Sequence, residues 1–219
     1  MNFRSHRKRL RWEFWNMKVN IIYLAAGNSR RFCIEKEKKE NKLLYPFHGR
    51  PLYEYGLEAL RTAARKWRES KIYVVTQYEE IYEAVSAYEE VTAVFSQESK
   101  KGLSYTIRKG LLAAGKEEAW YLFMTADQPF VSAETILGLI KGVEISQKNM
   151  GTILYEGVPA TPTIFAGSYY EELMALEGDK GGRKVLMAHP EEVYGYQVQD
   201  QKELKDFDHW EEVIEEEKR

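Results

Sequence analysis

The chain has 219 residues, of which 44% are hydrophobic and 30% are charged, and its formal net charge at pH 7 is −2. This length and apolar content favour one domain of α/β size with a substantial core. The nearly neutral charge excludes a dedicated, strongly basic nucleic-acid-binding domain, and the single cysteine, Cys33, excludes an intrachain disulfide and a cysteine-based metal cluster. The composition is typical of a reducing, cytoplasmic setting, and no apolar run approaches the roughly 18 residues that a membrane span needs.

The first segment, MNFRSHRKRLRWEFWN, is basic and aromatic and has no clear hydrophobic period. It lacks the apolar stretch and the small-residue cleavage site of a secretory signal. We expect residues 1–16 to be a disordered extension and residues 17–219 to form the domain, because Met17 directly precedes the first predicted strand. A contact of the extension with nucleic acid or with an anionic membrane surface is the minor alternative.

The rest of the chain alternates short apolar runs with longer amphipathic ones, which predicts strands and helices in turn. Such alternation implies right-handed crossovers and an α/β fold with a Rossmann-like, mainly parallel sheet and helices on both faces. Ligands of these sheets bind beyond the carboxyl ends of the strands. The predicted elements in chain order are a strand over 18–25, a loop over 26–46, a helix over 51–67, a strand over 71–77, a helix over 78–88, a strand over 92–96, a loop entering a helix over 102–115, a strand over 119–129, a helix over 132–146, strands over 151–156 and 162–167, a helix near 168–176, a strand near 193–198 and an acidic helix from about 209.

The first strand and the loop after it have the sequence IIYLAAGNSRRF (21–32). The loop begins with small residues and ends with basic ones. Gly27 allows a tight turn and the close approach of a ligand, and successive backbone amides in such a turn attract anions. Arg30, Arg31 and the later Lys42 add positive charges suited to phosphate oxygens. The loop therefore predicts a polyphosphate site, and an ordinary turn with solvated arginines is the alternative. Neither G-x-G-x-x-G nor the P-loop sequence G-x-x-x-x-G-K-[ST] is present.

Two acidic segments could supply metal ligands. Asp127 ends the strand in FMTADQPF, and Asp206 and Asp208 lie two residues apart in KDFDHWEE, on the same face if that segment is extended. Carboxylates from the two segments could together hold Mg²⁺ on the phosphates of a nucleotide. The alternatives are a helix-cap or turn role for Asp127 and a solvated acidic segment around the other two.

A glycine-rich, charged segment, LEGDKGGRKVL (176–186), lies between these carboxylates in the sequence. Its charged residues include Asp179, Lys180 and Arg183, and the glycines between them allow a flexible loop. Such a loop could bind the anion of a second substrate. A plain turn between helices is equally compatible with this composition.

Several of these segments, taken in order, resemble the molybdenum cofactor cytidylyltransferase-like group of the MobA-like NTP transferase family. LAAGNSRRF…NKLL is similar to the family's first signature, and TADQPF is similar to its metal-binding aspartate segment. KGLSYTIRKGL, PTIFAGSYYEELMALEGDKGGRKVL and DFDHWEE resemble its later segments, so the likeness runs from about residue 18 to 212. It implies a fold of the nucleotide-diphospho-sugar transferase type, and transfer of a nucleoside monophosphate from an NTP to a phosphorylated acceptor with release of pyrophosphate.

The resemblance also implies roles for individual residues. Asp127 with Asp208 would hold Mg²⁺, and Asp127, Arg31 and Lys42 would be catalytic. The run Ala-Ala-Gly over 25–27 favours CTP over GTP as the donor, a molybdopterin-type molecule is the implied acceptor, and a molybdoenzyme or its chaperone is a further implied partner. The implied nucleotide-binding residues are Leu24, Ala25, Ala26, Gly27, Asn28, Ser29, Arg31, Lys42, Gly102 and Ser104. The implied acceptor-binding residues are Thr161, Pro162, Asp179, Lys180, Gly181, Gly182 and Arg183.

Several positions depart from the family pattern. Phe32 and Cys33 stand where the family has Met-Gly, residues 34–40 are inserted before the lysine, and His-Trp at 209–210 replaces Thr-Pro. The lost glycine restricts the loop, and the insertion could displace the lysine. Two alternatives therefore stay open: the same chemistry with GTP or with another acceptor such as a sugar phosphate, and a nucleotide-binding maturation protein without turnover.

Overall fold

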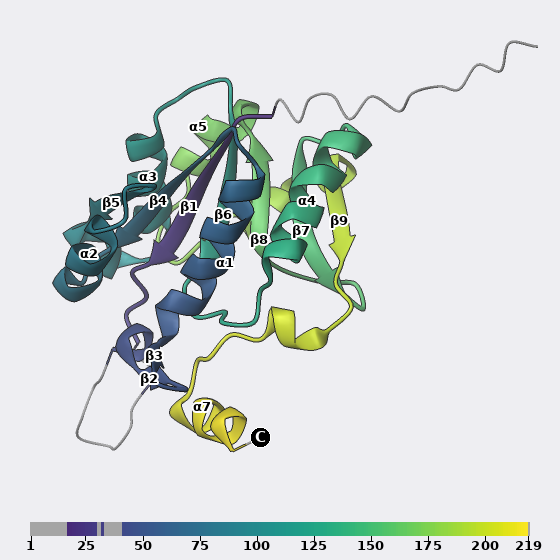
Figure 1. Cartoon of the computed structure of the whole chain (residues 1–219). Coiled ribbons are helices and arrows are strands. Elements are labelled where there is room, and N and C mark those ends of the chain that lie inside the picture. Colours follow the sequence, from purple (N-terminus) through teal and green to yellow (C-terminus); the bar gives the residue numbers. More distant parts are fainter. Residues whose placement is uncertain (1–16, 30–31, 33–40, 219) are drawn as a thin grey trace, which may run out of the picture.

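The computed structural model describes residues 17–29, 32 and 41–218 of the chain. Seven strands form the main sheet: β1 (Val19–Ala25), β4 (Ser70–Thr76), β5 (Val91–Phe95), β6 (Trp120–Thr125), β7 (Met150–Tyr155), β8 (Val158–Ala166) and β9 (Val193–Gln197). From one edge of the sheet to the other, their order is β5-β4-β1-β6-β8-β7-β9 (Figure 1). Two short strands, β2 (Pro46–Phe47) and β3 (Arg50–Pro51), form a separate hairpin.

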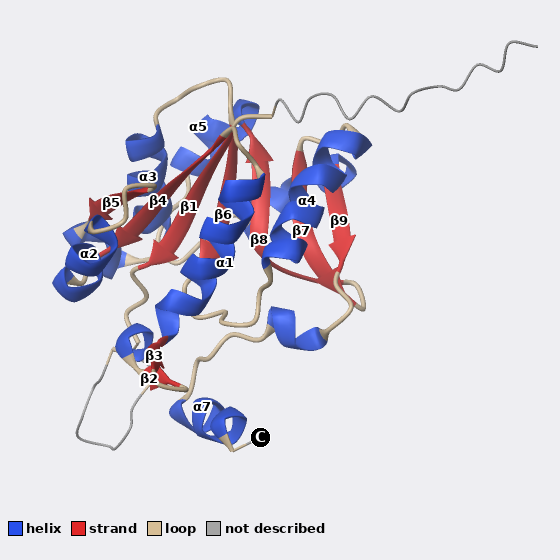
Figure 2. Cartoon of the chain, in the orientation of Figure 1, coloured by secondary structure: helices blue, strands red, loops and turns tan. Residues whose placement is uncertain are grey.

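Helices flank the sheet on both faces (Figure 2). They are α1 (Leu52–Lys66), α2 (Glu79–Ser86), α3 (Leu103–Ala114), α4 (Ala133–Ser146), α5 (Tyr170–Met174), α6 (Arg183–Ala188) and α7 (Trp210–Glu217). Residues of α1, α2 and α4 pack with Ile21 and Tyr23 of β1, whereas residues of α3, α5 and α6 pack with Ile22 and Leu24. Because successive side chains of a strand point to opposite faces, β1 lies between two apolar cores, and the predicted fold class is confirmed. No described helix is both long enough and apolar enough to cross a membrane.

Most neighbouring strands run parallel. β1 pairs in parallel with β4 and β6, β4 with β5, and β7 with β9, whereas β8 is antiparallel to both β6 and β7. Ala25 pairs with Thr76, and Leu24 pairs with Thr125, so the carboxyl ends of β1, β4 and β6 lie side by side. The loops that leave these strands therefore meet at one edge of the sheet, where parallel α/β sheets bind their ligands.

β8 begins at Val158, earlier than the strand expected over 162–167. Prolines within it weaken the strand signal, because proline lacks the N–H group that a strand ladder needs. The ladder between β7 and β8 shifts register after Thr152, and Thr161 and Pro162, which are joined by a cis peptide bond, form no pair with β7. Thr161 in this irregular part of β8 lines a cavity at the carboxyl edge of β6.

The turn before α3 requires glycine. Gly102 has a φ of +142°, and a Cβ atom there would lie 2.5 Å from the carbonyl oxygen of Gly178. That carbonyl accepts a hydrogen bond from the amide of Ser104, 3.0 Å away, so the segment around Gly178 packs against the amino end of α3. Gly115 at the other end of α3 also has a positive φ, +81°, but a Cβ atom there would meet nothing within 4 Å.

We expect Gly102→Ala to destabilise the protein by about 3 kcal/mol or more, because it combines backbone strain with a steric overlap. Gly115→Ala is the matched control and should cost only the strain, about 1–3 kcal/mol. Urea unfolding of both variants measures the difference in the free energy of unfolding. Equal losses in the two variants would show that the contact with Gly178 does not stabilise the fold.

Candidate active site

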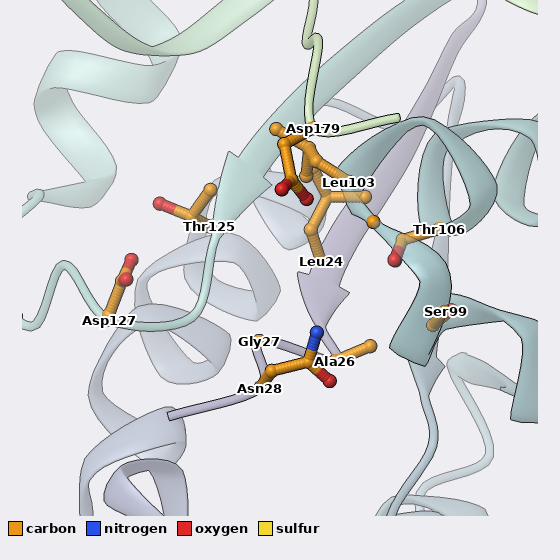
Figure 3. Close-up of a pocket in the computed structure, with 11 residues that line it drawn as sticks. Leu24, Ala26, Gly27, Asn28, Ser99, Leu103, Thr106, Thr125, Asp127 and Asp179 are labelled. Atoms are coloured by element: carbon orange, nitrogen blue, oxygen red, sulfur yellow. The ribbon is translucent and has the colours of Figure 1, made fainter. Parts of the chain in front are cut away.

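Two adjoining cavities open at the carboxyl ends of β1 and β6. The smaller, of about 220 Å³, lies between the loop after β1 and the start of α3 (Figure 3). The larger, of about 550 Å³, lies between β6, β8 and α6. Because the two cavities share wall residues, ligands bound in them would lie next to each other. The shared residues are Leu24, Leu103, Thr125, Asp127 and Asp179.

The loop after β1 is held through its carbonyl groups. Gln77, just after β4, donates from Nε2 to the carbonyl of Ala26 at 2.7 Å and to Asn28 Oδ1 at 3.0 Å. The hydroxyl of Tyr78 donates to the carbonyl of Gly27 at 2.6 Å. The amides of Gly27 and Asn28 make no hydrogen bond to the part of the chain that the structure describes. These two amides could therefore bind an anion.

Lys42 lies between this loop and the carboxylates. Its backbone amide donates to Ser29 Oγ at 3.1 Å. Its buried ammonium donates to Asp127 Oδ2 at 2.7 Å, to the carbonyl of Phe207 at 2.9 Å and to Asp208 Oδ1 at 3.3 Å, and these acceptors match its three donors. Burial lowers the pKa of Lys42, but the charges and hydrogen bonds of Asp127 and then Asp208 outweigh it and raise the pKa above the ordinary value. The insertion therefore leaves the lysine beside the carboxylates, in its charged form.

Three carboxylates meet beside Lys42. Oxygen atoms of Asp127, Asp206 and Asp208 all lie within 4.8 Å of one another. The side chain of Phe207 is fully buried, and its amide donates to the carbonyl of Asp127 at 3.1 Å. Because alternate residues of an extended segment point to the same side, the burial of Phe207 turns Asp206 and Asp208 toward Asp127.

Aromatic packing and a helix cap fix the segment that carries the later carboxylates. The ring of Phe207 packs against Phe47 of the β2–β3 hairpin and Phe130 after β6, at centroid distances of 5.2 and 5.9 Å. Glu212 in the first turn of α7 accepts hydrogen bonds from the amides of Asp208 and His209, at 2.8 and 2.9 Å. The hairpin and α7 thus hold this segment from two sides.

The three carboxylates suit a hard divalent cation, which prefers several oxygen ligands. Oδ1 of Asp127 is buried and has no hydrogen-bond partner in the described part of the chain, so its lone pairs are available. The cluster could hold such an ion if the ammonium of Lys42 moved aside.

The glycine-rich loop forms one side of the larger cavity. It joins α5 to α6, as a turn between helices would, and lines the cavity at the same time. Arg108 of α3 donates to the carbonyl of Leu176 at 2.7 Å and so ties the start of the loop to that helix. Of the predicted acceptor-binding residues, all but Pro162 and Lys180 line the cavity.

The predicted nucleotide-binding residues divide into two groups. Ala25 and Ser104 are fully buried and line neither cavity. Ser29 contacts the backbone of Lys42 instead, and Arg31 lies outside the described residues. Lys42 also lines neither cavity, and its ammonium contacts Asp127 instead. The five that line the smaller cavity are Leu24, Ala26, Gly27, Asn28 and Gly102.

Sequence reasoning left some residues of this region out of the predicted sets. The predicted metal pair, Asp127 and Asp208, omits Asp206, although the two-residue spacing already places Asp206 on the same face as Asp208. Thr125 and Gln128 also line the larger cavity. Both residues lie close to Asp127 in the segment TADQPF, and this closeness in sequence could have indicated that they belong to the site.

Comparison with known proteins agrees with this architecture. Residues 21–193, most of the chain, match the family model of the MobA-like NTP transferase domain. Among curated relatives, the Bifunctional protein GlmU of Baumannia cicadellinicola subsp. Homalodisca coagulata is 26% identical over 155 residues, and the match covers 64% of this chain and 32% of that protein. The chain therefore spans about a third of the length of this relative.

Solved structures share the fold. A nucleotidyl transferase from Methanothermobacter thermautotroptrophicus superposes with a TM-score of 0.74 and 21% identity, over 93% of this chain and 97% of that one. Rv0371c from Mycobacterium tuberculosis H37Rv superposes with a TM-score of 0.73 and 22% identity, over 93% of this chain and all of that one. A complex of Rv0371c with manganese superposes with a TM-score of 0.65 and 21% identity, over 83% of this chain and 89% of that one.

Asp206 offers a stability test of the carboxylate cluster. Burial, followed by the charges of Asp127 and Asp208, raises the pKa of Asp206 above its ordinary value of 3.8. The folded protein therefore binds this proton more tightly than the unfolded chain does, and stability falls as the pH rises through the raised pKa. We expect Asp206→Asn to unfold at a higher temperature than the wild type at pH 7 without divalent cations, and the gap to narrow toward pH 4.

Thermal unfolding followed by circular dichroism measures both effects. Added Mg²⁺ should raise the Tm of the wild type more than that of the variant, which has lost one carboxylate. Asp200→Asn is the matched control, because Asp200 caps the amide of Lys202 and lies outside the cluster. An Asp206→Asn variant less stable than the wild type at pH 7 would show that burial and repulsion do not make the charged form of Asp206 unfavourable.

Proposed function

This chain belongs to the MobA-like NTP transferase family and is a nucleotidyltransferase, and we propose that it uses Mg²⁺ to transfer CMP from CTP to a molybdopterin-type acceptor with release of pyrophosphate. The proposal rests above all on the meeting of Asp127, Asp206 and Asp208 beside two adjoining cavities. This arrangement suits a donor nucleotide and an acceptor that bind side by side, next to three carboxylates that are able to share one metal ion.

In this proposal, the triphosphate of the donor lies along the loop after β1. The amides of Gly27 and Asn28 hold phosphate oxygens, and the ammonium of Lys42 exchanges its carboxylate contacts for the triphosphate. Arg31, outside the described residues, adds positive charge on the side of the leaving pyrophosphate. A bound Mg²⁺ on the three carboxylates supplies charge neutralisation at the phosphates.

The transfer itself needs no nucleophile from the protein. An oxygen of the acceptor's phosphate attacks the α-phosphorus of CTP as the bond to pyrophosphate breaks, and catalysis of this kind depends on position and charge. Arg183 and the loop around Asp179 hold the acceptor in the larger cavity. CTP as the donor is supported by the Ala-Ala-Gly run over 25–27, and the acceptor by the likeness of the later segments.

A panel of CTP, GTP, ATP and UTP, each with Mg²⁺ and molybdopterin, tests the choice of donor. We expect pyrophosphate release with CTP to exceed that with GTP by about tenfold or more. Pyrophosphate release with GTP but not with CTP would show that the donor is GTP. Release with glucose 1-phosphate but not with molybdopterin would show that the acceptor is a sugar phosphate. Either result would still support nucleotidyl transfer. Mg²⁺-dependent CTP binding without release from any pair would point to a maturation protein without turnover.

Asp127→Asn tests the carboxylate cluster in catalysis. We expect this variant to fold, and to release pyrophosphate about 10²–10³-fold more slowly than the wild type or not at all, because the site loses a charge that faces the transferred phosphate. Circular dichroism checks the fold, and Asp200→Asn serves as the matched control with the wild-type rate. A rate near that of the wild type would refute the metal assignment.

A further inference from the structure

Gln128 lies in the turn after β6 and lines the larger cavity, although its side chain is only 4% exposed. It directly follows Asp127 in the chain, so it lies beside the carboxylate cluster. The mechanism above gives it no role. A polar side chain this deeply buried is normally fully hydrogen-bonded, so the state of each of its polar atoms matters.

Two hydroxyl groups fix the carbonyl end of this side chain. Thr125 Oγ1 at the end of β6 donates to Gln128 Oε1 at 3.0 Å, and Thr161 Oγ1 of β8 donates to the same oxygen. An amide oxygen has two lone pairs, so these two bonds use its full capacity. The orientation of the amide is therefore set by two strands of the sheet.

The amide nitrogen of Gln128 differs from the oxygen in its hydrogen bonding. Nε2 of Gln128 makes no hydrogen bond to the described residues, which leaves an amide donor that only a ligand or water in the cavity can satisfy. Thr125 Oγ1 and Thr161 Oγ1 also lie 3.4 Å apart. When both hydroxyl groups donate to Oε1, their oxygens can offer only lone pairs to a ligand. This wall of the cavity thus presents a donor next to acceptors, in a fixed arrangement.

We propose that Gln128 determines acceptor specificity by donating a hydrogen bond from Nε2 to the acceptor molecule. The matching acceptor carries a carbonyl or an unprotonated ring nitrogen next to an N–H group, as on the amide-like edge of a heterocycle, close to the phosphate that attacks. Sugar hydroxyls, which can turn to donate or accept, gain less from a fixed pattern of this kind. The inference rests on the proposed function and names the class of molecule that this site selects.

A purely structural role is the competing explanation, in which Gln128 only bridges β6 and β8. Gln128→Glu separates the two, because a carboxylate still accepts from both threonine hydroxyls but has no donor for the ligand. Thr161→Val is the second variant. It keeps the shape of the side chain and removes one of the two bonds that orient the amide. Gln147→Glu is the matched control, because this exposed residue follows α4 at the opposite edge of the sheet.

The experiment measures pyrophosphate release by the full chain with Mg²⁺ and CTP, using molybdopterin and glucose 1-phosphate as the acceptors. We expect Gln128→Glu to raise the KM for molybdopterin about 10–100-fold, and to raise it more than the KM for CTP. The KM for glucose 1-phosphate should rise less. Thr161→Val should raise the KM for molybdopterin about 3–10-fold, and Gln147→Glu should leave it unchanged.

An unchanged KM for the acceptor in Gln128→Glu, with the wild type active, overturns the inference and leaves the proposed function intact. If Gln128→Glu does not fold, the KM of Thr161→Val decides, and a wild-type value overturns the inference. A wild type that releases no pyrophosphate from any of the four NTPs with either acceptor overturns the proposed function, and the inference with it.

Discussion

Oxygen atoms of three carboxylates lie within 4.8 Å of one another in this protein, and a positive charge beside them offsets their mutual repulsion. The ammonium of Lys42 supplies the charge through its contacts with Asp127 and Asp208, at 2.7 and 3.3 Å. These residues come from the loop after β1, the end of β6 and the segment before α7. The fold must therefore bring three distant parts of the chain to one point before any chemistry can occur.

Two of the positions that depart from the family pattern, Phe32 and Trp210, pack beside this assembly. Phe32 is fully buried, and its ring lies edge-on to Trp210 at a centroid distance of 5.7 Å, while Trp210 in turn packs on Tyr45 at 4.6 Å. The substitution after the first loop and the substitution at the start of α7 are thus partners in one contact. Together with Tyr45 they pack the start of α7 against residues near the first loop.

Much of this structure follows from local pattern. Hydrophobic periods indicated the order of strands and helices, and the position of Asp127 after a buried strand indicated the edge where a ligand would bind. The spacing of Asp206 and Asp208 placed them on one face, but their meeting with Asp127 could not be predicted in the same way, because it depends on the burial of Phe207 against a hairpin far away in the sequence. Likewise, the orientation of Gln128 depends on Thr161, which lies in a part of β8 where prolines weaken the strand signal. The hydrophobic period of the sequence does not report long-range contacts of this kind.

The segment that carries Asp206 and Asp208 belongs to no strand of the main sheet. It is held by the packing of Phe207 and by the hydrogen bonds that Glu212 accepts at the start of α7. Segments held by few contacts open at a lower free energy than the strands of a core do. Local opening of this segment would therefore separate the two later carboxylates from Asp127 while the sheet stays folded.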